Sequence, residues 1–250
     1  MAIRCCSLGS GSKGNATLIM TDTTRLIVDC GFGIKDLTQR LARRSIEPTE
    51  IDAILVTHEH GDHGSGVARV ANKFNIDVYL TRGTSLHHSF DKLKQRNWIE
   101  AEQTVQIGDI ECLPYTVPHD AREPVQFVFQ TNGKKIGLLT DVGKSTPHII
   151  ELLDGCDLLL LEFNHDRTRL LNSRYPDSLK NRIIGDLGHL SNEQSQELLE
   201  QLTVKPKQLV ALHLSEENNS EQMVSDIIES YPQINYIIAE QNDGTAWINL

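Results

Sequence analysis

Residues 52–66, DAILVTHEHGDHGSG, contain three histidines and an aspartate within six positions: His58, His60, Asp62 and His63. The segment DAILVT predicts a buried strand and the following GSGVARVANKF predicts a helix, so these four side chains lie on the turn between them. Crowding them there has no evident benefit for stability, and such clusters usually bind metal ions, which favours a metal site over a solvated polar turn. A zincin helix is excluded, because the H-E-x-x-H pattern needs a histidine where Asp62 stands.

The remaining ligands of such a site are found at the ends of other apolar runs. The pattern H-x-H-x-D-H divides between two centres, and a catalytic zinc ion needs three protein ligands with one position left open. CLPYTVPH ends at His119, KKIGLLTD ends at Asp141, and QLVALHL ends at His213. Since sites in α/β proteins collect at the carboxyl ends of strands, these strand ends jointly predict one metal-binding site.

Strand and helix patterns alternate along the 250 residues. Strands are predicted at 3–8, 16–21, 24–29, 52–57, 77–81, 105–107, 110–117, 125–131, 134–140, 157–163, 208–214, 234–240 and 245–249. Helices are predicted at 34–44, 64–74, 84–95, 145–153, 191–202 and 220–230. Asn132-Gly133 is a two-residue hairpin signal. We expect one domain with two β-rich halves, roughly 1–131 and 132–250, built as two mixed sheets with helices outside.

The glycine-rich stretch GSGSKG at 9–14 fits the pattern G-x-G-x-x-G of dinucleotide-binding loops. That function requires a helix next, whose N-terminus receives the pyrophosphate, but the following NATLIM has the alternation of a strand. We therefore expect a hairpin turn that borders the site.

Composition limits the function classes. The formal charge of −10 disfavours a protein that coats nucleic acid through a basic surface, although it permits a local grip on phosphates. Five cysteines without a C-x-x-C pair fit a reduced cytoplasm. No run of about 18 apolar residues and no secretory signal is recognised, so neither a membrane span nor export is expected.

Several longer stretches carry a resemblance to a known family. THEHGDH followed by a single His, a single Asp and a late His resembles the metallo-β-lactamase superfamily, whose fold is a four-layer αβ/βα sandwich. SLGSGSKGNATLI, LIVDCGF, LLLLEFNHD, YPDSLKNRIIGDLGHLSN and HLSEENN are similar to its YycJ/WalJ-type branch. The resemblance implies a cytosolic, metal-dependent phosphodiesterase with 5′-exonuclease activity on double-stranded DNA.

The resemblance also implies roles for individual residues. One metal ion would be held by His58, His60 and His119, the other by Asp62, His63 and His213, and Asp141 would bridge both. Two divalent ions, zinc or manganese with iron also suitable, would clamp a phosphodiester and activate a bridging hydroxide. The tail GHLSN…PK…H resembles that of nucleases in which the early histidine lies over the scissile phosphate, which assigns His189. The candidate catalytic residues are Asp62, Asp141 and His189.

Substrate contacts are expected around an insert at 165–186. Its part 165–182 has five basic and two acidic residues, a net charge of +3 in an acidic chain. Arginine donates two parallel hydrogen bonds to phosphate, and a tyrosine can stack on a base, although a solvated helix face would have the same composition. The candidate substrate-binding residues are Asn164, His165, Arg167, Arg174, Tyr175, Lys180 and Arg182, of which Asn164 and His165 also suit the orienting of ligands.

Three functions therefore compete. The favoured one is a nuclease acting on DNA in preference to RNA. The alternative is a small-molecule hydrolase acting on a cyclic phosphate, phosphonate ester, thioester or lactone, which the absence of a large basic surface favours. A regulatory module with structural metal ions is disfavoured, because a structural site is closed and four-coordinate. The oligomeric state stays open.

Overall fold

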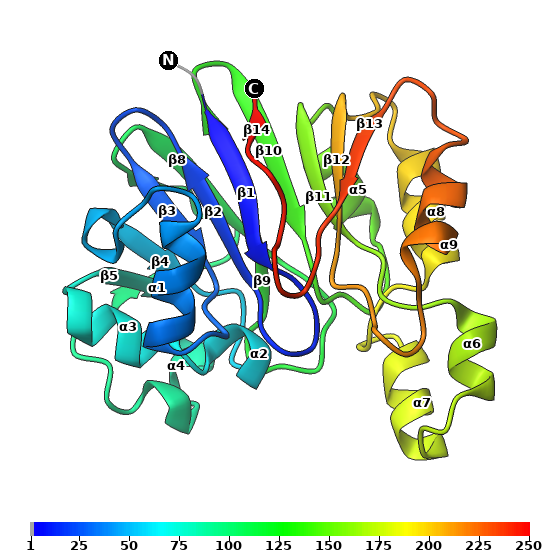
Figure 1. Cartoon of the computed structure of the whole chain (residues 1–250), viewed down its shortest axis with the longest axis horizontal. Coiled ribbons are helices and arrows are strands. Elements are labelled where there is room, and N and C mark those ends of the chain that lie inside the picture. Colours follow the sequence, from blue (N-terminus) through cyan, green and yellow to red (C-terminus); the bar gives the residue numbers. More distant parts are fainter. Residues whose placement is uncertain (1–2) are drawn as a thin grey trace. The chain divides into compact units, whose positions relative to one another are not determined.

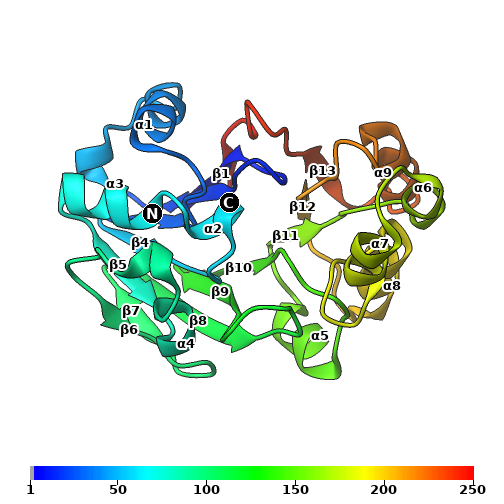
Figure 2. The same ribbon diagram turned by 90° about the horizontal axis from the view of Figure 1, so that it is seen from below.

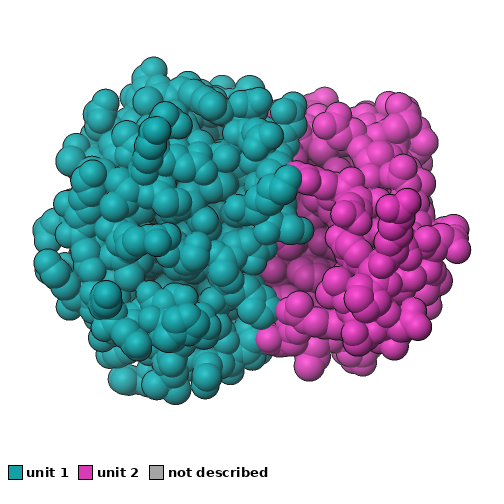
Figure 3. All heavy atoms as spheres, turned by 60° about the horizontal axis from the view of Figure 1, so that its bottom comes forward, with its two compact units in different colours: residues 1–116, 121–133, 240–250 teal, residues 117–120, 134–239 magenta. Residues whose placement is uncertain are grey.

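The computed structural model describes residues 3–250 (Figure 1), and the chain divides into two compact units, coloured separately in Figure 3. Unit 1 comprises residues 1–116, 121–133 and 240–250, and unit 2 comprises residues 117–120 and 134–239. Each unit contains its own strands and helices. Within residues 3–250, no helix combines the length and the apolar character that crossing a membrane requires.

Unit 1 contains a seven-stranded sheet in the order β14-β1-β2-β3-β4-β5-β6, as far as residues 3–250 show. Its strands are β1 (Arg4–Gly9), β2 (Ala16–Met20), β3 (Arg25–Val28), β4 (Ala53–Leu55), β5 (Asp77–Leu80), β6 (Asn97–Trp98) and β14 (Ile248–Asn249). Neighbours from β14 to β3 are antiparallel and those from β3 to β6 are parallel. The parallel strands β3 and β4 therefore end at the same edge, where Asp29 and the histidine-rich loop follow them.

Helices cover one face of this sheet. Unit 1 contains α1 (Ile34–Ala42), α2 (Gly61–Gly64), α3 (Val67–Phe74), α4 (Arg82–Ser85) and the 3₁₀ helices η1 (Pro48–Glu50) and η2 (His88–Phe90). Leu37 and Leu41 of α1 and Val70 of α3 share one buried cluster with Leu18 and Ile54 of the sheet. The amphipathic spacing of these apolar positions fixes both helices against the strands.

Unit 1 also contains the antiparallel strands β7 (Val105–Ile107), β8 (Ile110–Thr116) and β9 (Val125–Thr131). The turn after β9 has positive φ at both Asn132 (51°) and Gly133 (72°), which confirms the predicted two-residue turn. The hairpin predicted for the glycine-rich stretch 9–14 is also confirmed, because β1 and β2 pair antiparallel across it.

Unit 2 is built on four parallel strands in the order β13-β12-β11-β10: β10 (Lys134–Leu139), β11 (Leu158–Glu162), β12 (Gln208–Leu212) and β13 (Asn235–Ile238). Its helices are α5 (Pro147–Leu153), α6 (Arg167–Asn172), α7 (Asp177–Ile184), α8 (Asn192–Gln201) and α9 (Glu221–Ile228). Every residue of β11 is buried, which explains its unbroken leucine run. Figures 1 and 2 show α6 and α7 side by side.

Strand β6 was not predicted, the strand predicted at 245–249 is formed only at Ile248–Asn249, and two larger regions also differ from the sequence-based expectation. The helix predicted at 84–95 is wrong: α4 ends at Ser85, and only the short η2 and turns follow. The hydroxyl of Thr81 caps the N-terminus of α4, and Nδ1 of His87 caps the N-terminus of η2. These two caps start two separate short helices in place of one long helix. Helices α6 and α7 lie in the insert, for which no secondary structure was predicted.

Candidate metal centre and active site

The loop after β4 presents four potential metal ligands of unit 1. His58 and His60 precede α2, whereas Asp62 and His63 lie within this helix. The ring centroid of His58 lies 4.6 Å from that of His60 and 4.3 Å from that of His63. His58 and His63 are buried, and His60 and Asp62 are partly exposed. This short turn thus gathers imidazole and carboxylate donors of the kind that divalent transition-metal ions prefer.

Asp29, directly after β3, orients the ligand loop through a buried carboxylate. Its Oδ1 accepts from the N–H of Thr57 (2.8 Å), and its Oδ2 accepts from the Thr57 hydroxyl (2.7 Å). Nδ1 of His63 lies 2.7 Å from Oδ2, so this nitrogen carries the proton and leaves the Nε2 lone pair for a metal ion. Asp29 has a left-handed φ of 60°, which is strained for most residues and is held here by these bonds.

The glycine-rich turn borders the ligand loop, as expected, and the residue that does so is Asn15. Its backbone N–H donates to the carbonyl of Asp62 (2.8 Å). Its side-chain Nδ2 lies 3.3 Å from Oδ2 of Asp62 and 3.1 Å from Nε2 of His63. Its Oδ1 accepts from the N–H of Gly11 (2.8 Å), which fixes the amide. Sequence reasoning did not single out Asn15, although an amide directly after a tight glycine turn was available as a signal.

Unit 2 brings three of the predicted strand-end residues together. Oδ2 of Asp141 lies 3.7 Å from Nε2 of His119, and Oδ1 lies 3.1 Å from Nδ1 of His213. Nδ1 of His119 lies 3.1 Å from the carbonyl oxygen of Gly188, to which it donates. Nε2 of His119 is then the atom available as a ligand. All three side chains are buried, and Asp141 lies between the two imidazoles.

Glu162, the last residue of β11, belongs to the same cluster and was missed in the sequence. Its Oε1 lies 2.7 Å from Nδ1 of His189 and 3.2 Å from Nδ1 of His213, and its Oε2 accepts from the N–H groups of Val142 (3.2 Å) and Leu190 (3.0 Å). Burial raises the pKa of Glu162, but the charge of His189 and the hydrogen bonds from His189 and His213 outweigh it and lower the pKa to about 2. A carboxylate ending a run of four leucines was the available signal.

His189 lies in this cluster. Its ring centroid is 5.4 Å from that of His119 and 5.3 Å from that of His213. Burial lowers the pKa of His189, but the charge of Glu162 and the hydrogen bond to it raise the pKa overall. Asp141, Glu162, His189 and His213 each offer a ligand-type atom, and these atoms lie within 4.8 Å of one another. This cluster can hold a cation, and His189 can carry a proton close to it.

Two predicted substrate contacts are buried in hydrogen bonds of unit 2. Nδ2 of Asn164 donates to the carbonyl of His213 (3.1 Å), and its Oδ1 lies 3.2 Å from Nδ1 of His165. Burial lowers the pKa of His165 to about 4, so its ring is neutral near pH 7. The left-handed backbone of His213, with a φ of 57°, is held by this network. These contacts suit the orienting of a ligand.

The basic side chains of the insert fall into two groups. Arg182 binds Oδ1 and Oδ2 of Asp120 with both arms of its guanidinium (3.1 and 2.5 Å), and Lys180 donates to the carbonyl of Leu171 (2.8 Å). The side chains of Arg167 and Arg174 are exposed and form no hydrogen bond or ion pair within residues 3–250. Tyr175 between α6 and α7 is half-buried. Arg167 and Arg174 are therefore the residues of this set that can bind an external phosphate.

A buried pair of amides links the loops that carry His189 and His213. Nδ2 of Asn192 donates to Oδ1 of Asn219 (2.9 Å), and Nδ2 of Asn219 donates to Oδ1 of Asn192 (2.8 Å). Asn219 also donates to the carbonyl of Phe163 (2.8 Å). Because both amides are satisfied, this pair fixes the two loops at a defined separation.

The donor set suits divalent metal ions. Unit 1 supplies three imidazoles and a carboxylate, and unit 2 supplies further imidazoles with Asp141 and Glu162. In His63 and His119, one ring nitrogen is tied to an oxygen, which orients the other nitrogen as a donor, the usual arrangement around a bound metal ion. The side chains present therefore fit a metal site, and the mixture of nitrogen and oxygen donors does not choose among zinc, manganese and iron.

Residues 24–214 match the model of the β-lactamase superfamily domain. The chain is 36% identical over 223 residues to an exodeoxyribonuclease WalJ of Streptococcus pneumoniae, covering 86% of this chain and 83% of that one. It is 32% identical over 231 residues to an exodeoxyribonuclease YycJ of Bacillus anthracis, covering 89% and 88%. Both matches extend over most of each protein.

Solved structures agree with the expected fold. The metallo-β-lactamase fold protein YhfI of Bacillus subtilis superposes with a TM-score of 0.76 at 13% identity, covering all of both chains. A diphosphatase of the PhnP family superposes with a TM-score of 0.72 at 19% identity, covering 100% of this chain and 98% of that one. Identities this low show the fold alone. The predicted fold class, two mixed sheets with outer helices, is confirmed.

Proposed function

Because this chain belongs to the metallo-β-lactamase superfamily, we propose that it is a metal-dependent phosphodiesterase that degrades DNA from the 5′ end. The observation that carries the proposal is the pair of His/Asp clusters, each tied to buried partners that orient its donors. Two relatives named exodeoxyribonuclease that match along most of their length support nucleic acid as the substrate.

We propose that the clusters of both units together hold two divalent ions. His58, His60 and His119 would bind one ion, Asp62, His63 and His213 would bind the other, and Asp141 would contact both. Support comes from the complementary composition of the clusters, because neither unit alone supplies all of these ligands. Zinc and manganese both suit this set of imidazole and carboxylate donors, and iron would suit it as well.

When bound, two such ions would polarise the phosphoryl oxygens and make a water molecule nucleophilic near neutral pH. The chain's own groups then do the rest. Asp29 holds the proton on Nδ1 of His63, and Gly188 does the same for His119. Glu162 raises the pKa of His189 and so favours its protonated form, with Nδ1 engaged by the carboxylate and Nε2–H placed to donate to the leaving oxygen. His189 thus serves as the general acid.

We propose that Arg167 and Arg174 hold backbone phosphates of the polymer and that Tyr175 stacks against a base. Their support is the exposure of both arginines without side-chain partners among residues 3–250, next to a half-buried aromatic ring. Arg182 and Lys180, expected as further contacts, are engaged by Asp120 and Leu171 and are assigned here to holding the insert.

We also propose that the protein works in a reduced cytoplasm, which suits its five buried free cysteines.

A small-molecule hydrolase is the second candidate. The net charge of −10 favours a small substrate over a long polymer. Of the basic insert residues that were predicted to bind substrate, only Arg167 and Arg174 are not engaged within the protein. The two candidate functions predict different preferred substrates: a DNA polymer for the nuclease and a small ester for the small-molecule hydrolase.

The deciding experiment uses end-labelled single- and double-stranded DNA and RNA together with a nitrophenyl phosphodiester, each with zinc or manganese. Stepwise shortening of DNA from the 5′ end supports the proposal. Turnover of the small ester with no cleavage of any polymer would replace it with the second candidate.

A further inference from the structure

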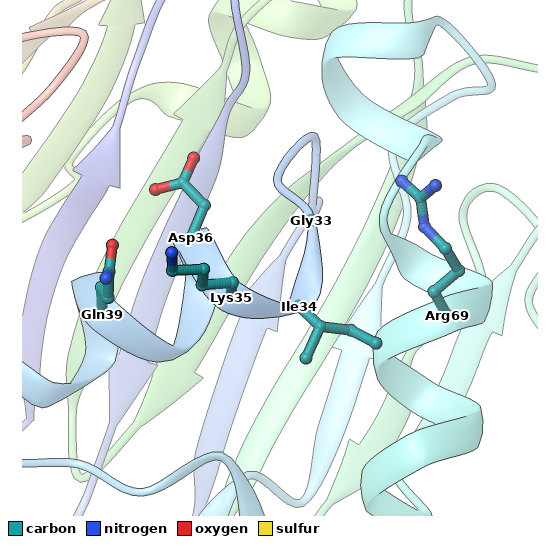
Figure 4. A pocket seen from close by; sticks show the side chains of 6 residues that line it. All are labelled: Gly33, Ile34, Lys35, Asp36, Gln39 and Arg69. Atoms are coloured by element: carbon teal, nitrogen blue, oxygen red, sulfur yellow. The ribbon is translucent and has the colours of Figure 1, made fainter.

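A hollow of about 570 Å³ lies on unit 1 between the start of α1 and helix α3. Figure 4 shows that it is lined by Gly33, Ile34, Lys35, Asp36, Gln39 and Arg69. The first five come from the beginning of α1 and the residue before it, and Arg69 comes from α3. It is largely open to solvent, so it can receive a group that is part of a larger molecule.

The hollow has a positive charge in an acidic chain. Its carboxylate, Asp36, is engaged by Nε of Arg40 at 2.8 Å. Arg40 is buried and also donates to the carbonyls of Leu8 and Asn242 (2.7 Å each), so this pair is part of the fold. The side chains of Lys35 and Arg69 are exposed and form no hydrogen bond or ion pair within residues 3–250. Two cationic groups are thus left without a counter-charge.

The walls of the hollow are joined to the loop that carries the metal ligands. The N–H of Cys30 donates to the carbonyl of His63 (2.7 Å), and the N–H of Gly66 donates to the carbonyl of Cys30 (2.8 Å). Helix α3 begins at Val67, directly after this contact. A ligand in the hollow would therefore lie against the segments that support the ligand loop.

We propose that this hollow binds a backbone phosphate of the nucleic acid at a distance from the bond that is cleaved. The inference rests on the proposed function, because it takes a polymer as the substrate. Arg69 and Lys35, which Figure 4 shows on opposite sides of Ile34, would supply the positive charge that attracts the phosphate, as basic side chains do in positioning contacts. The half-buried Ile34 offers an apolar surface for the attached sugar.

Gly33 allows this proposal to be tested without disturbing the packing. Its φ of −71° and ψ of 164° suit any residue, and no heavy atom lies within 4 Å of a Cβ built there. Gly33→Glu therefore adds a carboxylate at the hollow, and Gly33→Gln adds nearly the same volume without charge. The two variants differ in electrostatics alone.

The measurement is the affinity of the metal-loaded chain for a labelled DNA of about 20 nucleotides with uncleavable linkages, from low to high salt. Gly33→Glu should weaken binding about fivefold or more at physiological salt and lower the log–log salt slope by about 0.7–0.9. Gly33→Gln should bind like the wild type. Equal affinities for the two variants would overturn the proposal.

A second pair of variants removes the cations themselves. Lys35→Ala/Arg69→Ala should reproduce the weaker binding, whereas Lys92→Ala/Lys94→Ala, which removes two exposed charges elsewhere on unit 1, should not. Equal losses from both pairs would show a general charge effect and would overturn the hollow as a site. Cleavage of the nitrophenyl phosphodiester should stay unchanged in every variant, because that substrate has no second phosphate.

The outcomes also separate this proposal from the proposed function. If the wild type cleaves no nucleic acid, the proposed function is wrong, and the binding comparison still decides on the hollow. If the wild type cleaves DNA and the two Gly33 variants bind it equally, only the hollow is wrong.

Discussion

Nδ1 of His189 lies 2.7 Å from Oε1 of Glu162, a carboxylate that is fully buried at the end of β11. The same carboxylate oxygen lies 3.2 Å from Nδ1 of His213, so one acid links the proposed general acid to a proposed metal ligand. This pairing favours the protonated form of His189 and gives its ring a fixed orientation.

His189→Ala should reduce turnover by about 10²–10⁴-fold, the range for losing a positioned acid. Metal content by elemental analysis should stay at the wild-type level, because His189 is not proposed as a ligand. Loss of metal together with activity would instead make His189 a ligand.

Glu162→Gln should shift the pH dependence of kcat. Glu162 raises the pKa of His189, so the protonated acid is present at low pH and is lost as the pH rises through that value. Without the charge of Glu162, activity should decline at a lower pH than in the wild type. Glu200→Gln, an exposed acid of α8, is the control. Matching profiles for Glu162→Gln and the wild type would remove this role from Glu162.

Asp29→Asn should weaken metal binding about 10–100-fold, as loss of an orienting partner typically does. An amide no longer fixes the proton on Nδ1 of His63, although it can still accept from Thr57. A chelator titration measures the effect. Asp109→Asn, which likewise loses a carboxylate that accepts from a threonine hydroxyl in unit 1, should leave metal affinity unchanged. Equal metal affinity in both variants would contradict the orienting role.

The amide pair Asn192–Asn219 should show strong coupling. Replacing either residue alone by leucine leaves a buried amide without its partner and should destabilise the chain by about 1–3 kcal/mol. Replacing both should destabilise it by less than the sum, because no orphaned amide remains. Urea unfolding measures stability. Turnover should fall in all three variants, since the loops of His189 and His213 lose their link; a fully active double variant would refute this positioning role.

Arg167→Ala/Arg174→Ala should weaken DNA binding and lower the log–log salt slope by about 0.7–0.9 for each lost phosphate contact. Cleavage of a nitrophenyl phosphodiester should be nearly unchanged. Arg182→Ala should act differently: it removes the guanidinium from Asp120, whose Oδ1 lies 3.6 Å from Nε2 of His119, so both substrates should suffer. The same substrate pattern for both variants would remove the distinction between gripping and supporting arginines.

Much of the site could be anticipated from sequence, because strand ends are visible as polar residues that stop apolar runs. Asp141 and His213 follow β10 and β12 in this way, and parallel strands bring such ends to one edge. Glu162 was not predicted as a site residue because Phe163 follows it and extends the apolar run LLLLEF. The strand end was therefore not visible at Glu162. The roles of Asn15 and Asn192 could not be predicted, since they depend on hydrogen bonds between segments far apart in the chain.

The elements that sequence missed are those with little periodicity of their own. Helix α7 buries none of its residues and α6 buries only Leu170, so neither shows a clear apolar stripe. The span 84–95 does have helix-compatible residues, but the caps at Thr81 and His87 and the buried Phe90 favour short turns. Local hydrogen bonds and burial outweighed propensity there.

The most direct test of the account is metal-dependent cleavage by the wild type and by Asp141→Ala. Each chain is treated with chelator, reloaded with zinc or manganese, analysed for bound metal, and incubated with 5′-end-labelled duplex DNA. We expect the chelated wild type to be inactive, reloading to restore cleavage from the 5′ end, and Asp141→Ala to remain folded but to bind less metal and not to cleave DNA. Full metal content and unchanged cleavage in Asp141→Ala, or cleavage by the chelated wild type, would contradict it.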